Sequence, residues 1–482
     1  MTDLNRNELQ TAGPRIAGDQ RGAFWLEVKA LSKLAAPLAA TQVAQMLILA
    51  TDTLMLGHLS KEALAAATLG NNVFIMAWLV GLGPASAVPA MIAHIIGARA
   101  DDRAGVRSVV RMGLWAVALL SAPLLLVLAF TRDILILLGQ DPTLADGASL
   151  FMSTLMWGLP FSIAYQVLRN FSTAVNKPMM PLIVAALAVA FNALGDYVLI
   201  FGHFGFPRLE LFGSGLASAL SNVFSCLAML AFVLLEPRLK QYRVLHRWAR
   251  PHWAHLREIF TLGMPIGLTM MFEVALFVAA AFVMGLFGAD ALAAHQIAIT
   301  VPSITFMVPL GIGMAATVRV GLAKGAGDDV EARRAGFAAL AMATAFMAVT
   351  SALLLLFPRF IAGLWLPDLP ENTPVLALAV SFLMVAAGFQ LADGLQVTAS
   401  LSLRGLKDAR APMLIAAASY WLCGFPICLW LGFTLGLQGF GIWLGLAFGL
   451  MVAAAALVWR FNTLSKQASS EKMAPQIHHQ EE

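Results

Sequence analysis

Four carboxylates lie inside long apolar segments of this 482-residue chain, and their chemistry is the first question that the sequence raises. They are Asp52, Asp196, Glu273 and Asp393, and Glu273 is the only charged residue between positions 259 and 288. A carboxylate at the centre of a bilayer costs roughly 2.5–3.5 kcal/mol or more. Such a group is either protonated or bound to a cation, and both states allow coupling to an ion gradient.

Asp52 and Asp196 are predicted to form a pair. Each lies five or six residues before the same end of its apolar segment, so the two carboxylates can reach a similar depth. Asn192 lies one helical turn before Asp196 and shares its face, and Ser218 supplies a hydroxyl group from the next segment. Carboxylate, amide and hydroxyl oxygens suit a hard cation such as Na⁺, and two close carboxylates can equally share one proton.

Glu273 and Asp393 belong to the second half of the chain. Gln390 and Gln396 lie three residues on either side of Asp393, so the three polar side chains form a stripe along one helix face. A polar stripe on an apolar helix is expected to line a wet cavity rather than lipid.

Apolar side chains surround these two carboxylates in the sequence. They are Met270, Met271, Phe272 and Phe389. Flexible methionines and aromatic rings suit promiscuous apolar ligands, and the carboxylates add a preference for positive charge. The predicted ligands are lipophilic cations. The alternative for each carboxylate is a protonated side chain that bonds a backbone carbonyl at a helix kink.

The composition indicates the elements that must position these groups. Hydrophobic residues make up 60% of the chain and charged residues 12%, against about 25% charged residues in soluble domains. An all-α polytopic membrane protein is therefore expected, since each span needs about 20 apolar residues. Twelve transmembrane helices are predicted, at 34–57, 66–97, 107–130, 149–172, 180–202, 213–236, 259–287, 290–318, 334–358, 375–403, 411–434 and 438–461.

The basic residues predict the orientation. The face that contains the two tails and the even-numbered loops, counted with the adjoining helix ends, holds 27 of the 31 Lys and Arg, and the other face holds Lys61, Arg132, Arg208 and Arg359. The positive-inside rule then places both termini in the cytoplasm, in a bacterial-type inner membrane. The net charge of +4 is thus a topology signal, and no nucleic-acid partner is expected.

An internal repeat divides the chain. Residues 37–101 align with 265–329 at a constant offset of 228, so that the sequence ALAA occurs at both 63–66 and 291–294. The predicted organisation is a cytoplasmic N-terminal tail, an N-lobe, a cytoplasmic linker, a C-lobe and a cytoplasmic C-terminal tail. Their boundaries are 1–33, 34–236, 237–258, 259–461 and 462–482.

The two six-helix bundles insert with the same orientation, so an axis along the membrane normal should relate them. Rocking of one bundle against the other would give alternating access to a cleft between them. The repeat places Gln45 at the position of Glu273, and Ala280 at the position of Asp52. This asymmetry of the carboxylates indicates a role in function.

Several stretches, in the same order along the chain, resemble the multidrug and toxic compound extrusion (MATE) transporters, and most closely their NorM-like branch. They are TDTLMLG (51–57), NALGDYVLIFG (192–202), MPIGLTMMFEVALF (264–277), AAHQIAI (293–299), RVGLAKGAG (319–327) and SLRGLKD (402–408). The resemblance implies two six-helix lobes that form a V, and export of cationic drugs in exchange for Na⁺ or H⁺.

The resemblance also implies roles for individual residues. Asp52, Glu273 and Asp393 match functional carboxylates of NorM-type members, and Asn192, Asp196 and Ser218 match a cation site in the N-lobe. Ser218 replaces the usual threonine. Asp196 stands where NorM-type members can have asparagine, as in the DinF branch, and Phe389 where they can have tyrosine. These departures favour a cation site in the N-lobe over a Na⁺ site in the C-lobe.

The function expected from the sequence is a multidrug efflux antiporter, with Na⁺ or H⁺ as coupling ion and no other cofactor. Its partners would be cationic lipophilic small molecules, the coupling ion and membrane lipids, and the protein would act as a monomer. The first alternative is a lipid-linked oligosaccharide flippase, which needs a cationic cavity for pyrophosphate, and no basic residue is expected deep in the spans. An enzyme is not expected, because no catalytic or zinc-binding constellation is present in the sequence.

Overall fold

A computed structural model describes residues 20–246, 248, 251–366 and 369–471. The described chain is helical, without β-strands, and has twelve helical spans long and apolar enough to cross a membrane. The spans are α2 (Gln20–Leu59), α3 (Lys61–Ala98), α4 (Arg103–Ala129), α6 and α7 (Pro142–Leu155 and Leu159–Ala174, joined by a 3-10 turn), α8 (Met179–Phe201), α9 (Glu210–Leu235), α11 (Trp253–Leu286), α12 (Ala289–Gly325), α13 (Asp329–Leu356), α15 (Thr373–Gly405), α16 with α17 (Arg410–Ala417 and Phe425–Leu429) and α18 (Gln438–Glu471).

Short helices connect the spans. They are α5 (Thr131–Leu137), α10 (Pro237–Lys240) and α14 (Pro358–Gly363). Polar caps set several helix starts, because a side-chain oxygen can accept the free N–H of a first turn. Ser60 accepts from the backbone N–H of Ala63 at the start of α3, and Asp102 accepts from that of Gly105 at the start of α4.

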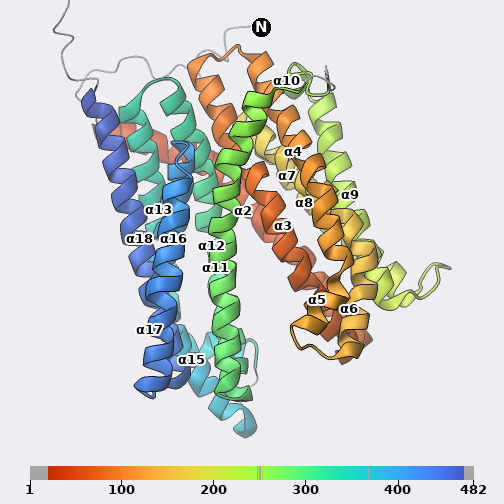
Figure 1. Ribbon diagram of the computed structural model, residues 1–482. Helices are drawn as coiled ribbons and strands as arrows, with labels where there is room; N and C mark the ends of the chain where they lie inside the picture. The colour runs from red at the N-terminus through yellow and green to blue at the C-terminus, as the bar shows by residue number, and fades with distance from the viewer. Residues whose placement is uncertain (1–19, 247, 249–250, 367–368, 472–482) are drawn as a thin grey trace, which may run out of the picture.

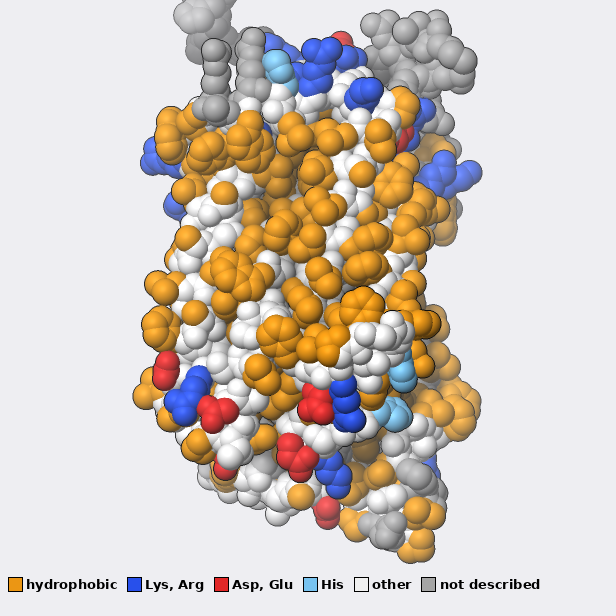
Figure 2. Space-filling model, turned by 90° about the vertical axis from the view of Figure 1, so that its right-hand side faces the viewer, with side chains coloured by type: hydrophobic (Ala, Val, Ile, Leu, Met, Phe, Trp, Pro, Cys, Tyr) orange, Lys and Arg blue, Asp and Glu red, His pale blue; other side chains and the backbone are white. Residues whose placement is uncertain are grey.

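The helices form two lobes, as predicted (Figure 1). The N-lobe contains α2 to α9 and the C-lobe α11 to α18, and each has its own buried apolar core. Figure 2 shows a hydrophobic band around the middle of the N-lobe side of the molecule. Lys and Arg side chains gather at its upper end, and acidic and basic side chains lie together at the lower end.

Helix α2 begins inside the segment predicted to be the N-terminal tail. Its first turns carry polar residues, so hydropathy alone gives no span there. Leu31 is nevertheless fully buried and packs with residues of α12 and α13. Glu27 is also buried and forms a bidentate ion pair with Arg319 of α12. The first helix of the N-lobe is therefore fastened to the C-lobe.

The lobes meet along one seam, where α3 packs against α11 and α12, and α2 packs against α12. Glycines make the approach close, since a Cβ at Gly83 would overlap the backbone of Gly263 and touch that of Gly267. A Cβ at Gly311, the repeat equivalent of Gly83, would come within 2.6 Å of the backbone of Ala39, the equivalent of Gly267. The seam is thus two-fold symmetric, and it lies toward the end where α2 begins and α3 ends.

Candidate functional site

A cavity of about 960 Å³ lies between the lobes. Its walls come from α2, α3 and α7 of the N-lobe and from α11, α12 and α15 of the C-lobe. Figure 1 shows the lobes diverging from the seam toward the end that carries α5 and α6. The cavity therefore occupies the position at which a rocking motion of the lobes would change access.

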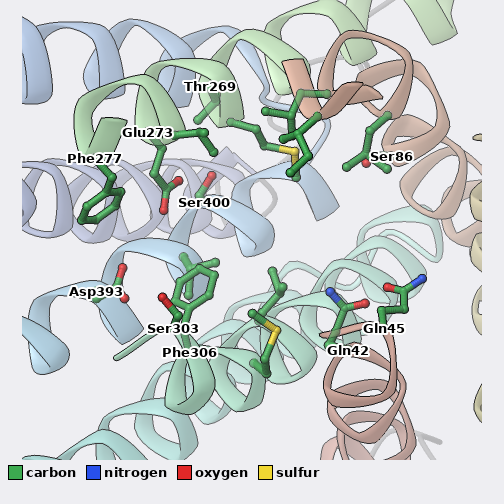
Figure 3. Close-up of a pocket in the computed structure, with 18 of the residues that line it drawn as sticks. Gln42, Gln45, Ser86, Thr269, Glu273, Phe277, Ser303, Phe306, Asp393 and Ser400 are labelled. Carbon is green, nitrogen blue, oxygen red and sulfur yellow. The ribbon is translucent and has the colours of Figure 1, made fainter. Parts of the chain in front are cut away.

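The C-lobe wall of the cavity is acidic. Glu273 of α11 and Asp393 of α15 both line it, and Figure 3 shows both carboxyl groups on this wall. Within the described chain, neither carboxylate forms an ion pair with a basic side chain. Arg404 interacts electrostatically with Glu273 but does not form a direct ion pair with it. The wall can thus receive positive charge from the cavity.

Apolar side chains, with several aromatic rings and methionines among the aliphatic residues, supply much of the remaining surface. Phe389 is buried, and its ring packs edge-on against that of Phe277, which also lines the cavity. Of the apolar residues expected near the carboxylates, Met270 and Phe389 line the cavity, whereas Met271 and Phe272 are absent from its lining. This wall is apolar, and its flexible methionines allow it to adapt to ligands of different shapes.

The two glutamines beside Asp393 occupy different environments. Gln396 lines the cavity with Asp393. Gln390 is fully buried and is absent from the lining. Its Oε1 accepts from the Thr350 hydroxyl at 2.5 Å, and its Nε2 donates to the hydroxyl of Thr305 at 2.9 Å. Gln390 therefore joins α15 to α13 and α12, and the structure does not bring it to the cavity surface.

The N-lobe wall of the same cavity carries amides and an arginine. Arg169 of α7 donates from Nη1 to Oε1 of Gln42 at 2.6 Å and to Oε1 of Gln45 at 3.3 Å. Gln45 is the repeat equivalent of Glu273, so the two symmetry-related positions face one cavity with an amide and a carboxylate. Figure 3 shows Gln42 and Gln45 at the end of the cavity away from Glu273 and Asp393.

The expectation that no basic residue lies deep in the spans is wrong. Arg169 and Arg404 are both buried and both line the cavity. Their Cα positions near helix ends suggested otherwise, but a guanidinium on a long stem reaches far from its backbone. For Arg169, the sequence contains a signal of this burial: the charged residue lies inside the predicted span 149–172.

The predicted N-lobe cluster forms, and it is separate from the cavity. The Ser218 hydroxyl donates to Oδ2 of Asp52 at 2.9 Å. The Asp52 carboxyl also interacts electrostatically with Asp196 and Asn192, which are fully buried. Asp52, Asn192, Asp196 and Ser218 are absent from the residues that line the cavity. The helices α2, α8 and α9 thus hold this cluster inside the N-lobe.

The polar atoms of this cluster have unused bonding capacity. Oδ1 of Asp52, both carboxyl oxygens of Asp196 and both side-chain polar atoms of Asn192 are buried without a hydrogen-bond partner in the described chain. Buried polar groups are normally satisfied, so these oxygens fit a small cation or a shared proton. The described residues contain no group of three His, Cys, Asp or Glu side chains arranged for a metal ion.

Comparison with known proteins gives the family. The family model described as MatE matches residues 37–198 and 265–430, one stretch in each lobe, and the two stretches begin where the two copies of the internal repeat begin. The chain belongs to the MatE family. A MATE protein is a multi-pass membrane transporter and not an enzyme.

Relatives of this MATE chain cover nearly its whole length. It is 43% identical over 430 residues to a "Probable multidrug resistance protein NorM" of Brucella suis biovar 1, which covers 89% of this chain and 91% of that one. It is 40% identical over 461 residues to a protein with the same description from Pseudomonas aeruginosa, with 93% of each chain covered.

Solved MATE structures share the fold. A eukaryotic MATE transporter superposes with a TM-score of 0.81 at 21% identity, covering 93% of this chain and 99% of that one. A structure described as the outward-facing conformation of a multidrug resistance MATE family transporter gives a TM-score of 0.83 at 20% identity, covering 92% and 97%. The two-lobe architecture of the chain is therefore that of its family.

Proposed function

We propose that this MATE protein is a multidrug efflux antiporter, which exports organic cations in exchange for inward movement of Na⁺ or H⁺. The observation that carries the proposal is the pair Glu273 and Asp393, which face a large apolar cavity without a direct basic partner in the described chain. A lipophilic cation can bind there through its charge and its rings together. The relatives described as probable multidrug resistance proteins NorM support a role in drug export.

The coupling ion would bind in the N-lobe cluster of Asp52, Asn192, Asp196 and Ser218. Two carboxylates with an amide and a hydroxyl suit Na⁺, and they can also share a proton. Movement of one charge through ~100 mV supplies about 2.3 kcal/mol. The ion can drive export only if it binds one arrangement of the lobes better than the other.

The seam is proposed to be the cytoplasmic gate, with both termini in the cytoplasm and the protein in a cell membrane of the bacterial inner type. In that orientation the lobes diverge toward the outside, so the cavity would release a bound drug to that side. Rocking of the two lobes would then open the seam, and the cavity would admit the next cation from the cytoplasm.

The test is efflux of ethidium from proteoliposomes, with Na⁺ and pH gradients imposed separately. Glu273→Gln and Asp196→Asn are measured beside the wild type, with Glu210→Gln, an exposed acid of α9, as the matched control. We expect Glu273→Gln and Asp196→Asn each to lower efflux by at least about tenfold (~1.4 kcal/mol) and Glu210→Gln to leave it unchanged. Ethidium efflux from wild-type vesicles that is independent of both the Na⁺ and the pH gradient would contradict the antiporter proposal.

A lipid-linked oligosaccharide flippase is the second candidate. Arg169 and Arg404 in the cavity are the observation that favours it, since pyrophosphate binds cationic side chains. Glu273 and Asp393, on the C-lobe wall that also carries Arg404, would repel such a ligand. Scrambling of a labelled lipid pyrophosphate without any ethidium efflux would select the flippase.

A further inference from the structure

Arg169 is a buried guanidinium without an acidic partner. Its side chain is 5% exposed, and Nη1 bonds only the neutral amide oxygens of Gln42 and Gln45. Nε is buried and has no hydrogen-bond partner in the described chain. Among the described residues, no acidic side chain forms a hydrogen bond or an ion pair with it. The positive charge is therefore uncompensated.

An uncompensated buried charge of this kind indicates a ligand. Arginine stays protonated in proteins, and a charge taken out of water is costly unless an opposite charge meets it. Arg169 lines the cavity, so a negative group in the cavity can reach it. The planar guanidinium carries a fork of donors that matches a carboxylate in two parallel hydrogen bonds.

Arg404 provides the contrast on the other side of the cavity. It lines the same cavity and is also buried, but Glu273 compensates part of its charge. In the N-lobe, the residue equivalent to Glu273 is the amide Gln45, which leaves Arg169 without a carboxylate. The cavity thus has a negative wall in the C-lobe and a positive point in the N-lobe.

We propose that Arg169, with Gln42 and Gln45, forms a subsite for the carboxylate of zwitterionic substrates. The cationic end of the same molecule would lie against Glu273 and Asp393. This inference rests on the proposed function, because it assumes that the cavity binds the transported molecule. Arg169 would thus be a specificity residue that separates molecules with a carboxylate from simple cations within the proposed substrates.

The experiment compares two dyes that differ only at the carboxylate: rhodamine B, a zwitterion at neutral pH, and its cationic ethyl ester. Binding of each to the full-length protein in lipid nanodiscs is measured by fluorescence polarisation, and the readout is the ratio of the two affinities. We expect Arg169→Gln to shift this ratio against the zwitterion by about tenfold, as for loss of a charge-assisted hydrogen bond. Arg169→Lys, which keeps the charge, should restore part of the preference.

Arg404→Gln is the matched control, since it removes the same charge from the other wall. A shift of the ratio as large as that of Arg169→Gln would overturn the local site, because overall cavity charge would then explain it. An unchanged ratio in Arg169→Gln would overturn the proposal directly. Failure of the wild type to bind the cationic ester is a different result, and it would reject the proposed function itself.

A measurement on the wild type covers the case in which Arg169→Gln does not fold. Millimolar benzoate, a carboxylate without a cation, should displace rhodamine B more strongly than it displaces the ester. Equal competition against both dyes would overturn the subsite. Radiolabelled inorganic pyrophosphate is added as a third probe, and its tighter binding at Arg169 than that of benzoate would assign the site to a phosphate ligand instead.

Discussion

Gly97 of α3 and Gly325 of α12 are equivalent in the repeat, and they make equivalent contacts across the seam. Each glycine lies against the backbone of the helix that carries the other. A Cβ at Gly97 would overlap the carbonyl oxygen of Leu322, and a Cβ at Gly325 would overlap that of His94. Leu322 and His94 are themselves 228 residues apart. Closure of this end of the molecule therefore depends on two symmetry-related positions that have no side chain.

Gly97→Leu should block closure of the seam. The new side chain meets backbone, which cannot move aside as a flexible side chain can, and overpacking costs about 1–3 kcal/mol. We expect ethidium efflux to fall by roughly tenfold or more. Gly285→Leu is the control, since Gly285 lies in α11 with no atom within 4 Å of an added Cβ. Equal efflux from both variants would mean that the seam does not open and close during transport.

Glu27→Gln should loosen α2 from the C-lobe. Glu27 is 2% exposed, and its loss leaves Glu331, at 3.6 Å, as the remaining acidic partner of the Arg319 guanidinium among the residues that the structure describes. Breaking a buried pair costs about 3–5 kcal/mol, and we expect about 1–3 kcal/mol because Arg319 is partly exposed. Thermal unfolding in detergent measures the change. Glu210→Gln, which breaks an exposed pair with Arg208, should leave the melting temperature unchanged.

Ser218→Ala should weaken binding of the coupling ion. The Ser218 hydroxyl is the hydrogen-bond donor to Asp52, and an unsatisfied buried acceptor costs about 1–3 kcal/mol. The ion concentration or pH that gives half-maximal efflux should therefore shift by roughly tenfold. Ser214→Ala is the matched control, because Ser214 is buried one turn earlier on α9 and its hydroxyl has no partner in the described chain. A similar shift in both variants would remove Ser218 from the ion site.

Glu236→Gln tests a contact outside the membrane spans. Burial acts to raise the pKa of Glu236, but the hydrogen bond from Lys177 and the backbone N–H groups of Leu239 and Arg238 outweigh it and leave the pKa below its usual value. A lowered folded-state pKa stabilises the protein above the unfolded pKa of about 4.3, and this contribution is lost as the pH falls through the folded-state value. We expect Glu236→Gln to cost about 1 kcal/mol at pH 7.

A pH series tests whether the charge of the Glu236 carboxylate causes this stabilisation. Melting temperatures of the wild type and Glu236→Gln should converge as the pH falls below about 4. Lys177→Met and the double variant complete a cycle that isolates the pair. A difference that persists at low pH would show that the carboxylate charge is not what stabilises this corner.

The sequence predicts those features that depend on local pattern. The spans follow from apolar length, and the two lobes follow from the repeat at an offset of 228. The Asp52–Ser218 contact was predicted because depth along a helix can be counted from its end. Asp393 lines the cavity as the polar stripe on its apolar helix predicts, and Glu273 lines it as the single charged residue of its apolar segment.

Features set by packing between distant helices were not predictable in this way. Gln390 shares a stripe with Asp393, yet two threonines from α12 and α13 bind it and keep it from the cavity. The depth of Arg169 depends on where its long side chain points. The span after α15 contains π-helical turns at Ala418–Gly424 and Trp430–Thr434, and residue periodicity gives no warning of such a change in helix register.

The separation of the N-lobe cluster from the cavity has a kinetic consequence. A driving ion and a drug that share no binding atoms do not displace each other directly, so raising the drug concentration cannot simply outcompete the ion. Their influence on each other is a coupling free energy carried by the arrangement of the lobes, and it is reciprocal for binding. The ion should change the maximal rate of export as well as the apparent affinity, in the manner of a mixed rather than a competitive effector.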